Sequence, residues 1–158
     1  MTQPKPSATT STYPTSGGAY VLESRVREEL SVQVGRLGEI TFEPGRYLYV
    51  GSAYGPGGIA ARVKRHLKAK KRRLHWHIDY LSAVIGVERV WVIPAGHECE
   101  IVSALLTDSE TSTPFIGFGS SDCRQCTAHL LLAGEQLSLP KALPNEARMH
   151  HVGGGPPR

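Results

Sequence analysis

Three neighbouring segments with two different periodicities constrain the fold most strongly. Residues 18–22 and 47–53 combine aromatic and β-branched residues with glycines, a composition that favours strands. In residues 59–67 the apolar positions instead recur at helical spacing. The stretch Gly-Pro-Gly-Gly at 55–58 must be a loop. The sequence therefore predicts two strands, the second followed closely by a helix.

The rest of the chain continues this mixture of strands and helices. Alternation predicts a strand at 30–34 and a partner at 40–42, joined by a hairpin turn at 35–38. Beyond the first helix, the pattern predicts a helix from 75 to near 86, a buried strand at 87–93, a helix at 98–107 and a short final element at 127–132. Strands, helices, a strand and a helix in this order predict an α+β domain with a small sheet flanked by helices.

The 158 residues are enough for one domain with a buried core, but too few for two. Residues 1–16 are rich in Thr, Ser, Pro and Gln and lack an apolar period, while 140–158 hold several prolines and a Gly-Gly-Gly run. Such segments bury too little surface to offset their ordering entropy. We expect a disordered arm at 1–16, a folded domain at 17–139 and a disordered tail at 140–158.

Sequence features also bear on the compartment. No apolar run approaches the ~18 residues of a membrane span. The first residues lack a basic start followed by an apolar stretch, so secretion is not expected. Three cysteines are an odd number, which fits a reducing compartment better than a disulfide framework. These features predict a cytoplasmic protein without membrane contact, and they indicate no protein partner.

Positive charge is concentrated in one stretch, although the net charge is only +4. Residues 44–78 contain no acidic residue. Such a cluster is an electrostatic footprint for a polyanion, and nucleic acid is favoured over a solvated helix face because no acidic residue pairs the charges locally. Eight of the chain's 18 basic residues lie between positions 62 and 73: Arg62, Lys64, Arg65, Lys68, Lys70, Lys71, Arg72 and Arg73.

Two triplets connect these patterns to a known family. Gly-Ala-Tyr at 18–20 and Tyr-Val-Gly at 49–51 precede an arginine on the next helix. In this the chain resembles the GIY-YIG nuclease superfamily, and in particular a branch that occurs alone or fused to DNA-repair enzymes such as endonuclease III. That branch shares the glycine-rich loop, a Glu-Cys pair, the Trp-His-Ile-Asp-Tyr block at 76–80 and the Gly-Phe-Gly-Ser-Ser-Asp-Cys run at 117–123.

The resemblance implies a fold and an activity. The family fold has a central three-stranded antiparallel sheet with flanking helices. Its better-known members are endonucleases that hydrolyse DNA phosphodiesters with one divalent metal ion, usually Mg²⁺ and alternatively Mn²⁺. The resemblance thus implies a role in DNA repair or processing, with DNA as the partner.

The resemblance also transfers a set of catalytic residues. A signature tyrosine could orient or deprotonate the attacking water, once metal and arginine lower its phenol pKa from about 10. The arginine can bind two phosphate oxygens and offset charge in the transition state. The histidine lies one helical turn later, where relatives often carry His or Tyr near the leaving group. The transferred residues are Tyr20, Tyr49, Gly51, Arg62 and His66.

The metal-binding glutamate of the family falls on the helix after the third strand. Glu98 shares a helix face with Ile101, Val102 and Leu105, which predicts that it points toward the sheet, whereas Glu100 points sideways. We therefore expect Glu98 to hold the metal, with Glu100 as the alternative. Better-known relatives place this glutamate about a turn further along, and the Asn that commonly follows has no clear match here.

Cysteine and histidine residues form a second group of possible ligands. The spacing of Cys123, Cys126 and His129 would suit a structural zinc ion if a fourth ligand such as Cys99 folds nearby. Buried cysteines that act as small apolar residues are the alternative.

Three functional hypotheses remain open at this stage. The first is a metal-dependent DNA endonuclease, supported by the transferred residues. The second is a non-catalytic nucleic-acid-binding module that keeps the fold and the basic helix, supported by the missing Asn. The third is a small zinc-stabilised interaction domain, in which the basic stretch contacts a protein.

Overall fold

A five-stranded antiparallel sheet forms the centre of the molecule. The computed structural model describes residues 13–68, 77–120 and 125–152. The strand order is β6 (Leu130–Ala133), β4 (Gly45–Ala53), β1 (Gly18–Val26), β5 (Arg89–Pro94) and β7 (Arg148–His151). All neighbouring strands pair antiparallel, and β1 pairs with β4 over its full length. The predicted α+β class is confirmed, but the sheet has five strands rather than three.

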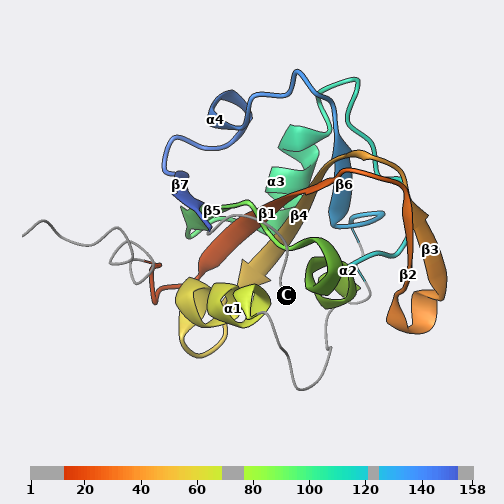
Figure 1. Ribbon diagram of the computed structural model, residues 1–158. Helices are drawn as coiled ribbons and strands as arrows, with labels where there is room; N and C mark the ends of the chain where they lie inside the picture. Colours follow the sequence, from red (N-terminus) through yellow and green to blue (C-terminus); the bar gives the residue numbers. More distant parts are fainter. Residues whose placement is uncertain (1–12, 69–76, 121–124, 153–158) are drawn as a thin grey trace, which may run out of the picture.

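Helices cover both faces of this sheet (Figure 1). α1 (Gly58–Leu67) and α2 (His77–Ile85) pack with Tyr20, Leu22 and Tyr49 into one core. α3 (Glu98–Leu105) and α4 (Leu139–Ala142) pack with Ala19 and Val21 into a second core. Residues of β1 therefore alternate between two apolar layers, as the sequence predicts. Within the described ranges, none of the helices has the length and apolar character needed to cross a lipid bilayer.

The predicted hairpin is confirmed as a separate two-stranded unit. β2 (Leu30–Gln33) pairs with β3 (Glu39–Phe42), and a 3-10 turn at Gly35–Leu37 joins them. Gly35 and Gly38 have φ angles of 46° and 80°, which glycine adopts without a steric penalty. Phe42 anchors the hairpin to the body through edge-on ring contacts with Tyr47 and Phe118.

Part of the predicted C-terminal tail is ordered, which corrects the boundary at residue 139. Within residues 140–152 the chain completes α4 and forms β7, which pairs with β5. The four-residue strand Arg-Met-His-His shows no alternating apolar pattern, because its side chains are mostly exposed. The sequence signal was missing because β7 is held mainly by backbone pairing along the edge of the sheet.

The last residues of the predicted N-terminal arm are also ordered. The Tyr13 ring is buried and lies 4.7 Å, centroid to centroid, from the His150 ring of β7. The carbonyl oxygens of Pro14 and Ser16 accept hydrogen bonds from the amides of Ala60 and Ile59, at 2.7 and 3.0 Å. These residues satisfy the unpaired N–H groups that begin α1, a role that requires no apolar period. Residues 1–12 and 153–158 of the predicted arm and tail lie outside the described residues.

A carboxylate buried at the centre of the sheet ties three strands together. Glu23 of β1 is 3% exposed. Its Oε2 accepts hydrogen bonds from Arg46 Nε of β4 at 2.9 Å and from Arg89 NH1 of β5 at 3.1 Å. Its Oε1 accepts one from the Trp91 indole at 3.1 Å. A buried charge is tolerated only when it is paired and hydrogen-bonded in this way.

Glu23→Gln should therefore destabilise the protein. The variant keeps the shape of the side chain but leaves two arginines without their counter-charge, which should cost on the order of 2–3 kcal/mol in the free energy of unfolding. Urea denaturation followed by circular dichroism measures this difference. Glu135→Gln is the matched control, because Glu135 pairs with Arg25 at 3.1 Å on the exposed surface and should matter little. Equal effects of the two substitutions would contradict a central role for Glu23.

Candidate active site

Four of the residues transferred from the family resemblance converge on the face of the sheet covered by α1 and α2. Tyr20 lies on β1, Tyr49 on β4, and Arg62 and His66 on α1. The His66 ring centroid is 5.5 Å from that of Tyr20 and 6.1 Å from that of Tyr49, and the two tyrosine rings are 6.5 Å apart. Segments far apart in the chain thus bring two phenols, an imidazole and a guanidinium into one cluster.

Gly51 makes this cluster possible by making room for a side chain. It lies directly opposite Tyr20 in the β1–β4 register. A Cβ atom at position 51 would overlap the ring and hydroxyl of Tyr20. Gly51 thus leaves space for the Tyr20 phenol, which lies opposite it on the neighbouring strand. The spacing between the two triplets therefore has a steric meaning.

The Tyr20 hydroxyl begins a buried hydrogen-bonded chain that ends on α2. It lies 2.8 Å from His66 Nε2, and His66 Nδ1 lies 3.2 Å from Asp79 Oδ1. Because the carboxylate can only accept, we assign the proton to Nδ1, so that Nε2 accepts from Tyr20. Asp79 and His66 are both buried. This Tyr–His–Asp arrangement fixes the tautomer and orientation of the imidazole.

The contact between Asp79 and His66 was not predicted from the sequence. The usable signal is the place of Asp79 in α2, where it follows the apolar Ile78 and shares a helix face with Ser82, both of which are buried. A carboxylate on an apolar helix face needs a buried partner. Sequence spacing alone does not identify that partner, because His66 lies on another helix.

The environment keeps both phenols protonated near neutral pH. Burial raises the pKa of Tyr20 well above its usual value of 10.0, the Tyr49 phenol and Glu98 raise it further, and Arg62 offsets part of the rise through its charge and a side-chain hydrogen bond. Burial also raises the pKa of Tyr49, with Glu98 and Asp79 adding to the rise and Arg62 opposing it. Tyr20 is 1% and Tyr49 5% exposed. Tyr20 can therefore pass a proton toward His66, rather than rest as a phenolate.

Arg62 sits between the tyrosines and an opening at the surface. Its NH1 donates to the Ser52 carbonyl oxygen at 3.1 Å, at the end of β4. Together with Arg65 and the loop before α1, it lines an open hollow of about 180 Å³. A guanidinium held at its base by a backbone carbonyl keeps a fixed direction, which suits recognition of a phosphate.

Arg65 has an acidic partner, which corrects the expectation that the basic stretch is unpaired. Its NH2 lies 3.5 Å from Asp79 Oδ2, at the far end of the Tyr20–His66 chain. The basic stretch is free of acidic residues along the sequence, but the first carboxylate beyond it folds back onto α1. Lys64 and Lys68 are exposed on α1 and near its end. The predicted nucleic-acid-binding residues Lys70, Lys71, Arg72 and Arg73 lie outside the described residues.

The two candidate metal glutamates occupy different environments on the first turn of α3. The Glu98 side chain is 29% exposed. It lines an open hollow of about 400 Å³ with Ser52, Tyr54 and His97. Its charge raises the pKa of both signature tyrosines, so the carboxylate lies near the phenols. Glu100 is exposed. Glu98 is thus the less exposed of the two carboxylates, as the helical spacing predicts.

A glycine-rich turn closes the cluster on the side of Tyr49. Gly119 has a φ of 73°, and a Cβ there would approach the Tyr49 ring to 2.7 Å. The Gly119 amide donates to His77 Nδ1 at 2.8 Å. Part of the Gly-Phe-Gly-Ser-Ser-Asp-Cys run therefore packs against the second signature tyrosine. Asp122 and Cys123 of the run lie outside the described residues.

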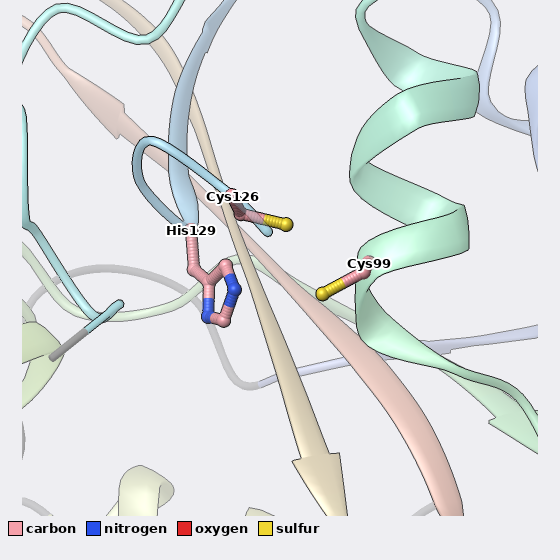
Figure 2. Close-up of side chains that lie close together, drawn as sticks. All are labelled: Cys99, Cys126 and His129. Carbon is pink, nitrogen blue, oxygen red and sulfur yellow. The ribbon is translucent and has the colours of Figure 1, made fainter. Parts of the chain in front are cut away.

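Cys99, Cys126 and His129 also come together, between α3 and the segment that leads into β6 (Figure 2). Their possible ligand atoms all lie within 4.8 Å of one another. Cys99 is on α3, and the other two precede β6. Cys99 therefore meets the condition stated for a zinc site, that it folds near the Cys-x-x-His segment, while Cys123 lies outside the described residues.

Gly51→Ala should disrupt the tyrosine cluster. The added methyl group must displace the Tyr20 ring, and such overpacking should cost roughly 1–3 kcal/mol in the free energy of unfolding. A ring displaced toward solvent also loses the burial that raises its pKa, so more phenol should ionise near pH 10 in an absorbance titration. The control is Gly55→Ala, since a Cβ at position 55 meets no atom within 4 Å. Unchanged stability and titration of the position 51 variant would contradict the steric role.

Comparison with known proteins places the chain in a family. Residues 19–150 match the model of Domain of unknown function DUF123, a span that includes nearly the whole sheet and every residue of the tyrosine cluster. No curated protein and no solved structure matches the chain significantly. Because the match covers well over half of its length, the chain belongs to the DUF123 family.

Proposed function

We propose that this protein is a metal-dependent endonuclease of the GIY-YIG type, which hydrolyses phosphodiester bonds in DNA during repair or processing. The observation that carries the proposal is the convergence of Tyr20, His66 and Asp79 in one buried chain beside Arg62, with the Glu98 carboxylate near the same phenols. Phosphodiester hydrolysis requires a proton acceptor for water, a cation for phosphate charge and a carboxylate for metal, and all three are present.

Each residue has a distinct task in the proposed reaction. The Tyr20 oxygen accepts a proton from the attacking water while its own proton moves to His66 Nε2, 2.8 Å away. The imidazolium formed in this way is stabilised by the Asp79 carboxylate. Arg62 donates to the phosphate oxygens on which charge grows. This relay explains how a phenol whose pKa is raised by burial can still act as a base: it transfers the proton onward instead of holding the negative charge.

The residues around Glu98 fit a hard divalent cation. Mg²⁺ is usually bound through one or two carboxylates together with substrate phosphates and water, and Glu98 offers one partly exposed carboxylate at the edge of a hollow. When bound, Mg²⁺ or Mn²⁺ would neutralise phosphate charge and lower the pKa of a water ligand.

One observation favours the second candidate function, a nucleic-acid-binding module without catalysis. The signature tyrosines are 1% and 5% exposed, so neither ring presents much surface to a substrate. The exposed lysines of α1 and the hollow beside Arg62 would still serve to bind a phosphate backbone. DNA binding and DNA cleavage therefore need to be measured separately.

Cleavage is tested by the nicking of supercoiled plasmid in Mg²⁺ and in EDTA. We expect nicking only with the metal, and Arg62→Ala should slow it by about 10²–10³-fold, the usual effect of losing one preorganised donor. Glu98→Gln should abolish it, since the charge is lost while the shape is kept. The matched controls are Arg36→Ala, at an exposed arginine of the hairpin turn, and Glu100→Gln. Activity that survives both Arg62→Ala and Glu98→Gln would exclude the proposed site.

Binding is tested through its salt dependence on duplexes of unrelated sequence. If Lys64 and Lys68 contact phosphates, replacing both with Ala should flatten the log–log salt slope by roughly two units. The loss should be similar for all sequences, because phosphate contacts carry no base information. Lys141→Ala, on α4 across the sheet, serves as the control. Salt-dependent binding without any metal-dependent nicking would support the binding module instead, and affinity that is insensitive to salt would contradict both functions.

A further inference from the structure

We propose that Cys99, Cys126 and His129 bind a thiolate-preferring metal ion, zinc, at a site adjacent to Glu98, the carboxylate proposed above to hold magnesium. The three side chains come from the first turn of α3 and from the segment that leads into β6. Figure 2 shows the two sulfur atoms directed toward each other across the space between these elements, with the His129 ring beside them.

The distances suit a tetrahedral ion. The three ligand atoms lie within 4.8 Å of one another. A zinc ion with bonds of about 2.3 Å to sulfur and about 2.0 Å to nitrogen holds its ligand atoms roughly 3.5 Å apart. Small side-chain rotations are enough to reach that separation. Two sulfurs and one nitrogen select zinc over magnesium, which prefers oxygen ligands.

A buried nitrogen of His129 gives evidence for a ligand that does not depend on the cysteines. The residue is 3% exposed, and within the described part of the chain its Nε2 has no hydrogen-bond partner. A buried ring nitrogen without a partner has lost its hydration without gaining a hydrogen bond, which is unfavourable. The other nitrogen, Nδ1, lies 3.5 Å from Glu98 Oε2. Metal-binding histidines usually direct their second nitrogen to a carboxylate in this way, which fixes the tautomer that leaves the first nitrogen able to bind metal.

A metal explains these features together, whereas the alternatives explain only part of them. Cysteines that act as small apolar residues account for the packing, and a disulfide between Cys99 and Cys126 accounts for the facing sulfurs. Both alternatives leave the buried Nε2 of His129 without a partner. Binding of the ion displaces the two thiol protons to solvent, and water completes the fourth position.

The site would fix the first turn of α3 to the strand segment next to β4. Glu98 acts here as a positioning residue, because its carboxylate orients the His129 ring rather than contacting the ion. The proposal does not depend on the nuclease function, since zinc would hold the same elements together in a protein that only binds DNA.

Cobalt titration of the chelator-treated, reduced, full-length protein tests the proposal without DNA. Co²⁺ in a tetrahedral sulfur site gives an intense thiolate-to-metal charge-transfer band and strong visible bands. We expect these to saturate at one equivalent and to disappear when Zn²⁺ is added. Zn²⁺ should also protect Cys99 and Cys126 from alkylation by iodoacetamide, as mapped by mass spectrometry, a measurement that needs only the wild-type protein.

Variants assign the ligands. Glu98→Gln should weaken Co²⁺ binding roughly 10–100-fold, as loss of an orienting carboxylate does, and should keep the charge-transfer band. Cys99→Ser and His129→Gln should weaken it more and change the spectrum. His97→Gln, at an exposed neighbouring histidine, is the control and should bind as the wild type does.

Three results would overturn the proposal. The first is the absence of a charge-transfer band when Co²⁺ is added to the reduced wild-type protein. The second is alkylation of both cysteines at the same rate with and without Zn²⁺. The third is a site that responds to formation of a Cys99–Cys126 disulfide but not to metal. A wild-type protein that binds Zn²⁺ but does not cut DNA would contradict only the nuclease proposal.

Discussion

The burial of β1 on both faces is the constraint on which the rest of the structure depends. A strand at the centre of a sheet that is covered by helices on both sides has little contact with water, so each buried polar side chain on it needs an internal partner. On one face Tyr20 contacts His66, His66 contacts Asp79, and Asp79 pairs with Arg65 near the surface. On the other face Glu23 accepts hydrogen bonds from arginines on both neighbouring strands. The candidate site is the first of these two sets of contacts, the one around Tyr20.

How much of this could be predicted depends on how local each signal is. Periodicity of two and of 3.6 identified β1, β4, β5, α1 and α3, because those segments bury one or two regular faces. The same signal predicted which β1 side chains share a face, because the alternation of Tyr20 with Ala19 and Val21 can be read from neighbouring residues alone. The edge strand β7 and the ordered residues 13–16 were missed because backbone hydrogen bonds, which every sequence can make, are a large part of what holds them in place.

The candidate site shows the same division. Family resemblance transferred Tyr20, Tyr49 and Arg62, and the structure brings them together. It did not transfer the partner of His66, because the pairing with Asp79 joins two helices and depends on how they cross. The steric role of Gly51 was not predicted either, since it depends on the strand register that places Gly51 opposite Tyr20. Residue types were therefore easier to predict than their contacts.

The capping of α1 has a consequence for how a phosphate can be recognised. A helix start usually offers unpaired N–H groups and a positive dipole end, which many proteins use to hold anions. In this chain the amides of Ile59 and Ala60 are already taken by the Ser16 and Pro14 carbonyls, and Gly58 has no room for a side chain beneath that segment. In the proposed function, phosphate recognition at this end of the sheet would therefore depend on side chains, chiefly the Arg62 guanidinium. Unlike a backbone cradle, such a contact can be moved, neutralised or replaced by changing a single codon.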